Sequence, residues 1–175
     1  AIVTLEGKEG SYTEVSLIRR AGEQQIGYLP SHTLIPAIKD AEARAADWRA
    51  FGEKFLGVPY KRGGRSAAGL DCSALLQLSL SAAGFQVPRD STPQLAFMKP
   101  AAKTQDTRFK EYQRGDVLFW DGHVGICVSS ELLLHANAYH ASVAIENIEQ
   151  AINRIKRHFG KPAEHIDGTL LLQLL

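Results

Sequence analysis

The sequence predicts an α+β fold, in which helices come first and an antiparallel sheet follows. One observation is a run at residues 72–83 that contains no Gly or Pro, follows Asp71 and ends before Gly84. The other is a series of three short apolar segments separated by turns, at residues 116–120, 123–128 and 132–136. With 175 residues, 45% of them hydrophobic, the chain can bury the core of one compact domain and carry an appendage.

The first 36 residues predict short β-strands, at residues 12–17 and 25–29, the second ending in Pro30. The string Gly27-Tyr28-Leu29-Pro30 resembles the end of a bacterial SH3-like module. Residues 1–36 are therefore predicted to be the latter part of such a module, although a plain β-meander explains the pattern nearly as well.

A helical linker is predicted at residues 37–46, which are rich in Ala and charged side chains. The main domain is then predicted to span residues 47–175. Its first helix, at residues 47–56, carries Trp48, Phe51 and Phe55 on one face, so we expect Trp48 to anchor the core.

The helix at residues 72–83 is predicted from its boundaries and its apolar surface. Asp71 is a preferred N-cap residue, and Gly84 is suited to the position after the helix. Cys72 would then lie at a helix N-terminus, where free N–H groups and the helix dipole favour a thiolate. The alternative is that Cys72 is only a small buried hydrophobe.

A histidine on the following strands can complete a Cys–His nucleophile. Alternation places His123, Gly125 and Cys127 on one face. The small size of Gly125 and Cys127 predicts that a helix packs on that face, with its N-terminus within reach of His123. With a three-residue loop at 129–131, the numbers of paired residues on the two strands would add up to 260. His135 would then lie diagonal to His123, within reach as a third group that orients its ring.

Three alternatives for these histidines stay open. Each could be structural, a two-residue loop would change the pairing, and zinc could bind Cys72 with His123, His135 or His140. The usual C-x-x-C or H-x-x-x-H spacing of zinc sites is missing.

The composition argues against several classes of protein: nucleic-acid-binding, membrane-spanning and disulfide-rich. A net charge of +1 and a pI near 8.0 predict no nucleic-acid partner, and no cofactor is expected. No apolar stretch approaches the roughly 18 residues of a membrane span. Two cysteines are too few for a disulfide framework, so Cys127 is expected to be a spare free thiol. Because the single Met is Met98, Ala1 is expected to follow removed residues. The sequence leaves the oligomeric state open.

A set of ordered motifs covering about residues 47–150 resembles the NlpC/p60 family of bacterial cell-wall cysteine peptidases. The motifs are Gly57-Val58-Pro59-Tyr60, Gly63-Gly64-Arg65-Ser66, Gly69-Leu70-Asp71-Cys72-Ser73, Val87-Pro88-Arg89-Asp90-Ser91 with Gln94, Gly115-Asp116-Val117-Leu118-Phe119, His123-Val124-Gly125-Ile126 and Leu134-His135-Ala136. The resemblance implies a papain-like fold, with Cys72 as nucleophile, His123 as base and His135 as third residue. Arg62 replaces a usual aromatic residue, and Ala74 replaces a usual Gly.

The SH3-like segment makes the chain similar to the subgroup that cleaves free murein peptides after γ-D-glutamate. In that subgroup a Tyr and an Asp bind the free amine of L-Ala, which implies roles for Tyr60 and Asp71, with Ser73 and Ser91 nearby. Asp71 can also be a plain N-cap, and Ser91 a turn residue.

The resemblance thus implies an endopeptidase for the γ-D-glutamyl–diamino acid bond of murein peptides, with no metal. A role in peptide recycling would place it in the cytoplasm, with the periplasm or cell wall as the alternative. Two other functions remain open: an amidase or acyltransferase using the same Cys–His pair, and a non-catalytic wall-binding module.

Overall fold

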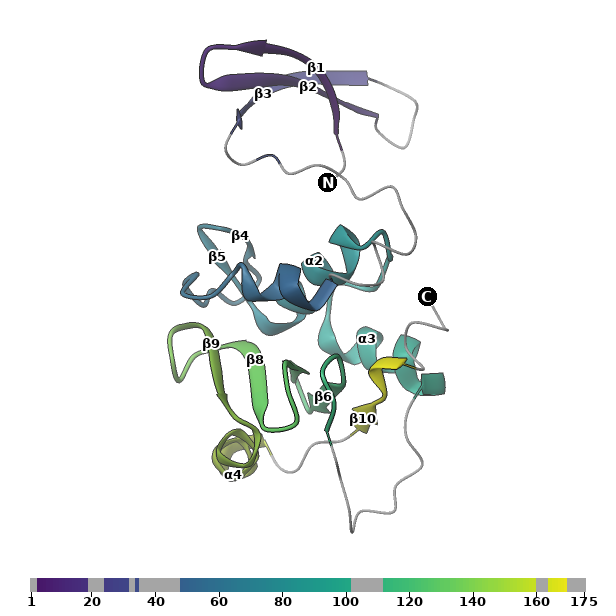
Figure 1. Ribbon diagram of the computed structural model, residues 1–175, viewed down its shortest axis with the longest axis vertical. Helices are drawn as coiled ribbons and strands as arrows, with labels where there is room; N and C mark the ends of the chain where they lie inside the picture. Colours follow the sequence, from purple (N-terminus) through teal and green to yellow (C-terminus); the bar gives the residue numbers. More distant parts are fainter. Residues whose placement is uncertain are drawn as a thin grey trace. The chain divides into compact units, whose positions relative to one another are not determined.

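The computed structural model describes residues 3–18, 24–31, 34, 48–101, 112–159 and 164–169. The chain divides into two compact units, Ala1–Ala37 and Ile38–Leu175, which are described separately (Figure 1). The linker predicted at residues 37–46 lies outside the described residues.

The first unit is a three-stranded antiparallel sheet in the order β1-β2-β3. Its strands are β1 (Thr4–Glu9), β2 (Tyr12–Ile18) and β3 (Gln24–Pro30). The two strands predicted from the sequence are confirmed, and β1 adds a third. Val15, on the central strand, is buried. The likeness to an SH3 module stays a prediction.

The second unit contains a five-stranded antiparallel sheet in the order β10-β6-β7-β8-β9. The strands are β6 (Val117–Trp120), β7 (His123–Cys127), β8 (Leu132–Asn137), β9 (Ser142–Asn147) and β10 (Glu164–Ile166). The three predicted strands correspond to β6, β7 and β8. The edge strands β9 and β10 were not predicted.

Three α-helices accompany this sheet: α2 (Cys72–Ala82), α3 (Ser91–Met98) and α4 (Ile148–Phe159). The helix predicted at residues 72–83 is thus confirmed by α2. Residues 48–53 are also helical, and Trp48 is fully buried in the core as predicted. Smaller elements complete the unit: β4 (Arg65–Ser66), β5 (Gly69–Leu70) and the 3-10 turn η2 (Lys99–Ala101).

Both faces of the sheet are covered, which places it between two helical layers. Leu75, Leu76 and Leu80 of α2 share a core with Val124 and Ile126 of β7. The opposite face forms a second core with α4, which Figure 1 shows end-on beside β8 and β9.

The prediction that α2 packs against the Gly125 and Cys127 face is therefore wrong. Cys127 lies in the α4 core, and the space beside Gly125 is filled by Leu133, which would lie 2.9 Å from an added Cβ. Alternation separated the two faces correctly, but the helix on the Cys127 face is α4 rather than α2, and a leucine of the neighbouring strand fills the space beside Gly125.

Candidate active site

Cys72 is the first residue of α2, and its position is fixed by the residues before it. Asp71 is the N-cap: its Oδ1 accepts a hydrogen bond from the Ala74 N–H at 2.8 Å. The preceding loop folds tightly against β5, since a Cβ on Gly64 would lie 2.5 Å from the Gly69 carbonyl oxygen. This close approach explains the glycine at position 64.

The Cys72 side chain is only 7% exposed. Burial raises the pKa of its thiol, and the charge of Asp71 adds to the rise. The backbone N–H groups of Val124, Ser73 and Cys72 act in the opposite direction by hydrogen bonding to the sulfur. The helix N-terminus therefore does stabilise negative charge as predicted, but burial outweighs it, and the resting group is a thiol whose proton a base must accept.

His123 begins strand β7, which packs against α2. Cys72 lies in the same core as Val124, the residue after His123, and the Val124 N–H is one of the groups that lower the pKa of the thiol. Burial, followed by the charges of His135 and Arg154, lowers the pKa of His123 to about 3. The imidazole is therefore neutral near neutral pH, which is the form that can accept a proton.

His135 lies beside His123 as the hairpin register predicted. Ile126 pairs with Leu134 and Cys127 with Leu133, so pairs sum to 260, and the Val128 N–H bonds to the Leu132 carbonyl. The Nε2 atom of His123 is 2.9 Å from the Nδ1 atom of His135. The three-residue loop and the contact between the two histidines are confirmed.

Sequence reasoning missed the next partner, Glu146 of β9. Its Oε1 lies 2.6 Å from Nε2 of His135, and the same oxygen pairs with the Arg154 guanidinium from α4. Tyr139 covers that guanidinium at 4.3 Å from its ring centre. Finding Glu146 would have required the β8–β9 register, in which Leu133 pairs with Glu146, and β9 was not predicted.

Asp71 is bound by Arg89, a second residue that was not predicted as part of the site. Nη1 of Arg89 donates to Oδ1 at 2.9 Å and to Ser73 Oγ at 2.9 Å, while Nη2 donates to Oδ2 at 2.8 Å. Gly63 N–H and Ser73 Oγ also donate to the carboxylate. Hydrogen bonds from Arg89, Ala74 and Gly63 outweigh burial and hold the pKa of Asp71 below its usual value.

This network gives the Asp71 carboxylate protein partners without any substrate. Five donated hydrogen bonds fill the roughly four lone-pair sites of a carboxylate. Arg89 was visible in the sequence as part of the Val87 to Ser91 motif, but only the fold brings it to Asp71.

Tyr60 and Ser91 lie near this network. The Tyr60 N–H bonds to the Ala141 carbonyl at 2.8 Å, and Tyr60 forms a β-bridge with Leu70. Burial raises the pKa of Tyr60, and its electrostatic interactions with Cys72 and Asp71 add to the rise. Ser91 is half-buried at the start of α3, two residues after Arg89.

Asp90, next to Ser91, differs from Asp71. It occupies the N-cap position of α3, but its side chain makes no capping hydrogen bond and is 77% exposed. Its Oδ1 lies 3.9 Å from Nη1 of Arg89, so the segment that supplies Arg89 also presents a largely exposed carboxylate.

A metal is not needed to explain the polar cluster. Within the described residues, His135, His140 and Glu146 bring potential ligand atoms within 4.8 Å of one another. Arg154 already supplies the positive charge opposite Glu146, and both ring nitrogens of His135 have protein partners. The group does not include Cys72 or His123, so it is not the zinc site considered from the sequence.

Cys127 is separate from the site. It is fully buried in the α4 core, and both cysteines are free thiols. The prediction that Cys127 is a spare thiol is confirmed.

Comparisons with known proteins agree with this geometry. Residues 57–159 match the NlpC/P60 family. The gamma-D-glutamyl-L-lysine dipeptidyl-peptidase of Bacillus subtilis (strain 168) is 29% identical over 155 residues, covering 86% of this chain and 50% of that protein. Dipeptidyl-peptidase 6 of Lysinibacillus sphaericus is 28% identical over 133 residues, covering 72% and 46%.

Solved structures show the same fold. An NlpC/P60 family protein from Bacillus cereus superposes with a TM-score of 0.59 at 22% identity, covering 95% of this chain and 53% of that one. The peptidoglycan hydrolase RipB of Mycobacterium tuberculosis gives 0.55 at 23% identity, covering 76% and 68%.

The fold is the papain-like α+β fold predicted from the sequence, with Cys72 at the start of α2 and the pair His123–His135 on the sheet. This chain belongs to the NlpC/P60 family, and the class predicted from the sequence is confirmed at the level of the family. It spans about half the length of the curated relatives it matches. No helix among the described residues is both long and apolar enough to traverse a bilayer.

Proposed function

We propose that this protein is a cysteine endopeptidase that hydrolyses the γ-D-glutamyl–diamino acid bond of peptidoglycan peptides with a free N-terminal L-Ala. One observation carries the proposal: the buried thiol of Cys72 lies at the start of α2, beside β7, and His123 of β7 contacts His135 of the neighbouring strand. The name of the Bacillus subtilis relative, a gamma-D-glutamyl-L-lysine dipeptidyl-peptidase, supports the choice of bond.

The chemistry follows from the protonation states. His123, neutral in the resting site, accepts the thiol proton of Cys72 as the sulfur attacks the γ-glutamyl carbonyl carbon. The backbone N–H at the start of α2 stabilises the resulting oxyanion. The imidazolium then donates its proton to the leaving amine as the C–N bond breaks, which leaves a thioester on Cys72. Water, deprotonated by His123, hydrolyses that thioester and restores the thiol.

The free-amine requirement needs a carboxylate for the substrate ammonium. Because the lone pairs of Asp71 are occupied, we assign this role to Asp90, which is exposed and next to Ser91. Asp71 then holds Arg89, Ser73 and the start of α2 in place, and Tyr60 lines the same region. Intact peptidoglycan has its L-Ala amine in an amide bond, so this requirement favours released peptides and a recycling role in the cytoplasm over remodelling of the wall.

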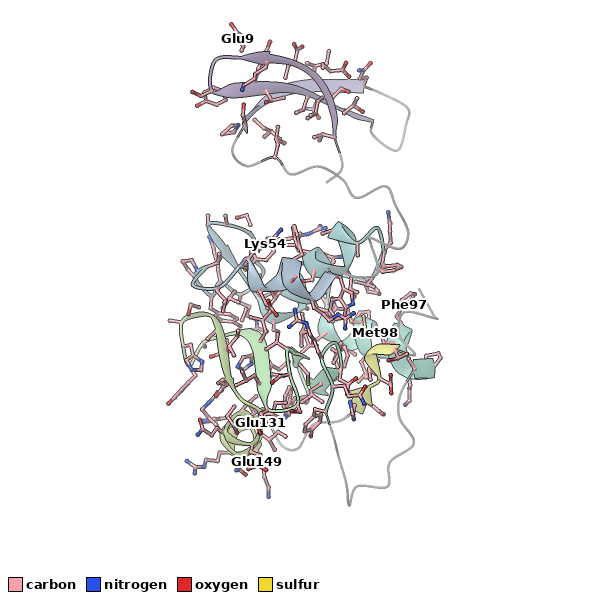
Figure 2. All side chains as sticks on the ribbon, in the orientation of Figure 1. Glu9, Lys54, Phe97, Met98, Glu131 and Glu149 are labelled. Carbon is pink, nitrogen blue, oxygen red and sulfur yellow. The ribbon has the colours of Figure 1, made fainter. Side chains whose placement is uncertain are left out.

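The test compares L-Ala-γ-D-Glu-L-Lys with its N-acetylated form, using mass spectrometry to follow products. We expect kcat/KM for the acetylated peptide to be lower by roughly a hundredfold, because a charged partner is lost. Asp90→Asn should reduce cleavage of the free peptide toward the rate of the acetylated one. Glu131→Gln is the control, because Glu131 is an exposed carboxylate in the β7–β8 turn (Figure 2). Equal rates on both peptides would remove the free-amine proposal, and no cleavage of either would favour a binding module.

A further inference from the structure

We propose that Glu146, held by Arg154, is a positioning residue that fixes the tautomers of His135 and His123 and leaves Nδ1 of His123 unprotonated as the base. The inference rests on the proposed function in one respect, that His123 accepts the thiol proton. It adds two residues, Glu146 and Arg154, to the group of Cys72, His123 and His135. Both lie on elements that the sequence did not connect with the site.

Four elements bring this chain of contacts together. β7 supplies His123, β8 supplies His135, β9 supplies Glu146 and α4 supplies Arg154. The contacts run without interruption from His123 Nε2 to His135 Nδ1 at 2.9 Å, and from His135 Nε2 to Glu146 Oε1 at 2.6 Å. His135 is fully buried, and the Glu146 side chain is 10% exposed, so water does not compete for these bonds.

The direction of the hydrogen bonds follows from what each group can do. An ionised carboxylate can only accept, so His135 must carry its proton on Nε2 and donate it to Glu146. A neutral His135 then has a bare Nδ1, which can only accept, so Nε2 of His123 must carry a proton. A neutral His123 therefore has an unprotonated Nδ1. Reversing any one bond would place a proton on the atom that has to accept one.

Arg154 keeps Glu146 ionised and oriented. Its guanidinium pairs with the same Oε1 that accepts from His135, and Tyr139 stacks over it. His140, from the turn between β8 and β9, is the other titratable group facing this carboxylate, with Nδ1 at 3.9 Å. Hydrogen bonding and charge from His135, with the charges of Arg154 and His140, outweigh burial and lower the pKa of Glu146. The negative charge of Glu146 also favours the imidazolium that forms during turnover.

If Glu146 only supported the fold, replacing it would leave the tautomers of His123 and His135 unchanged. Ring-nitrogen NMR measures those tautomers. In ¹⁵N-labelled Cys72→Ala protein, we expect both His123 and His135 to be protonated at Nε2 and bare at Nδ1. His165 is an internal reference, because its Nε2 lies 2.6 Å from Asp116 Oδ2 in an equivalent pair outside the site. A proton on Nδ1 of His135 or of His123 would overturn the inference, and this measurement needs no substitution at Glu146 and no turnover.

Substitutions then test the cause. In Glu146→Ala, His135 loses its acceptor, and we expect a population with Nδ1 protonated in both histidines but not in His165. Peptide cleavage by the matching Cys72-containing variant should fall about ten- to a hundredfold, the usual effect of an outer partner of a functional histidine. Glu146→Gln should keep the Nε2–H tautomer, because Arg154 requires the amide oxygen to stay in place, and should lose less activity than Glu146→Ala.

The control is Glu149→Gln, an exposed carboxylate in the first turn of α4, which should change neither tautomers nor rate. Unchanged tautomers in a folded Glu146→Ala protein would overturn the inference. The expected tautomers in a protein that cuts no peptide would leave it standing and contradict the proposed function instead, so the two failures can be told apart.

Discussion

Arg89 donates to both carboxylate oxygens of Asp71, at 2.9 and 2.8 Å, and thereby joins the start of α2 to the segment that precedes α3. Asp71, the residue before Cys72, is thus an anion that is held in place and paired with a cation. Its charge raises the pKa of Cys72, and the nearby guanidinium limits that effect. This pairing is the reason why Asp90, rather than Asp71, is proposed to bind the substrate amine.

Replacing Arg89 should therefore destabilise the second unit. Arg89→Met leaves the Asp71 carboxylate buried without its main partner, and we expect a loss of about 1–3 kcal/mol, reduced by the partial exposure of Arg89. Urea unfolding followed by tryptophan fluorescence measures this, because Trp48 and Trp120 are both buried in the second unit. Arg65→Met, an exposed arginine of β4, should change stability by less than about 0.5 kcal/mol. Equal effects of the two substitutions would contradict the assigned role.

Local features of the sequence were sufficient to predict helix α2 with Cys72 at its start and the hairpin that carries His123 and His135. Asp71 and Gly84 mark the ends of α2 because capping depends on a few adjacent residues, and the three-residue loop at 129–131 sets the β7–β8 register. The contact between His123 and His135 follows directly from that register.

Long-range partners could not be predicted in the same way. Predicting the contact of Glu146 with His135 requires predicting β9 (Ser142–Asn147), which mixes apolar and polar residues without a clear alternation. Arg89 reaches Asp71 across the packing of α2 and α3, which no local pattern encodes. The misassigned face of β7 has the same origin, because alternation does not reveal which helix covers which side.

Cys127 should be dispensable for activity. Cys127→Ala removes a sulfur from the α4 core at a cost of about 1 kcal/mol in stability, with the rate of peptide cleavage retained. The measurement is kcat/KM on the tripeptide alongside urea unfolding. A loss of activity in folded Cys127→Ala protein would mean that the two cysteines are coupled, contrary to their positions in separate cores.

The two histidines should differ in their importance. His123→Ala removes the base and the acid for the leaving amine, and should lower kcat by roughly two to four orders of magnitude. His135→Gln should cost less, because its amide oxygen can accept from His123 while its NH₂ donates to Glu146. Steady-state kinetics of both variants checks this order, and it would be refuted by a His135→Gln protein as impaired as His123→Ala.

His123 should make the second unit acid-sensitive. The pKa of His123 is lowered to about 3 by burial in the folded state, against 6.5 for an ordinary histidine. Between these values the unfolded chain binds the proton and the folded chain does not, so stability is fully present above pH 6.5 and falls as the pH falls toward 3. From pH 7 to pH 5 the native protein should lose about 1–2 kcal/mol more than His123→Gln. Parallel losses in urea titrations of the two proteins would show that His123 is not held neutral by the fold.

The central claim is that Cys72 cuts the γ-D-glutamyl bond, and it is tested most directly by the release of lysine from L-Ala-γ-D-Glu-L-Lys. Native protein should produce L-Ala-γ-D-Glu and free lysine, and Cys72→Ala should be slower by at least about a thousandfold, because no other group can form the acyl intermediate. The unfolding curve of Cys72→Ala should match that of the native protein to within about 1 kcal/mol, since only a small side chain is truncated. Comparable lysine release by Cys72→Ala, or none by the native protein, would contradict the account.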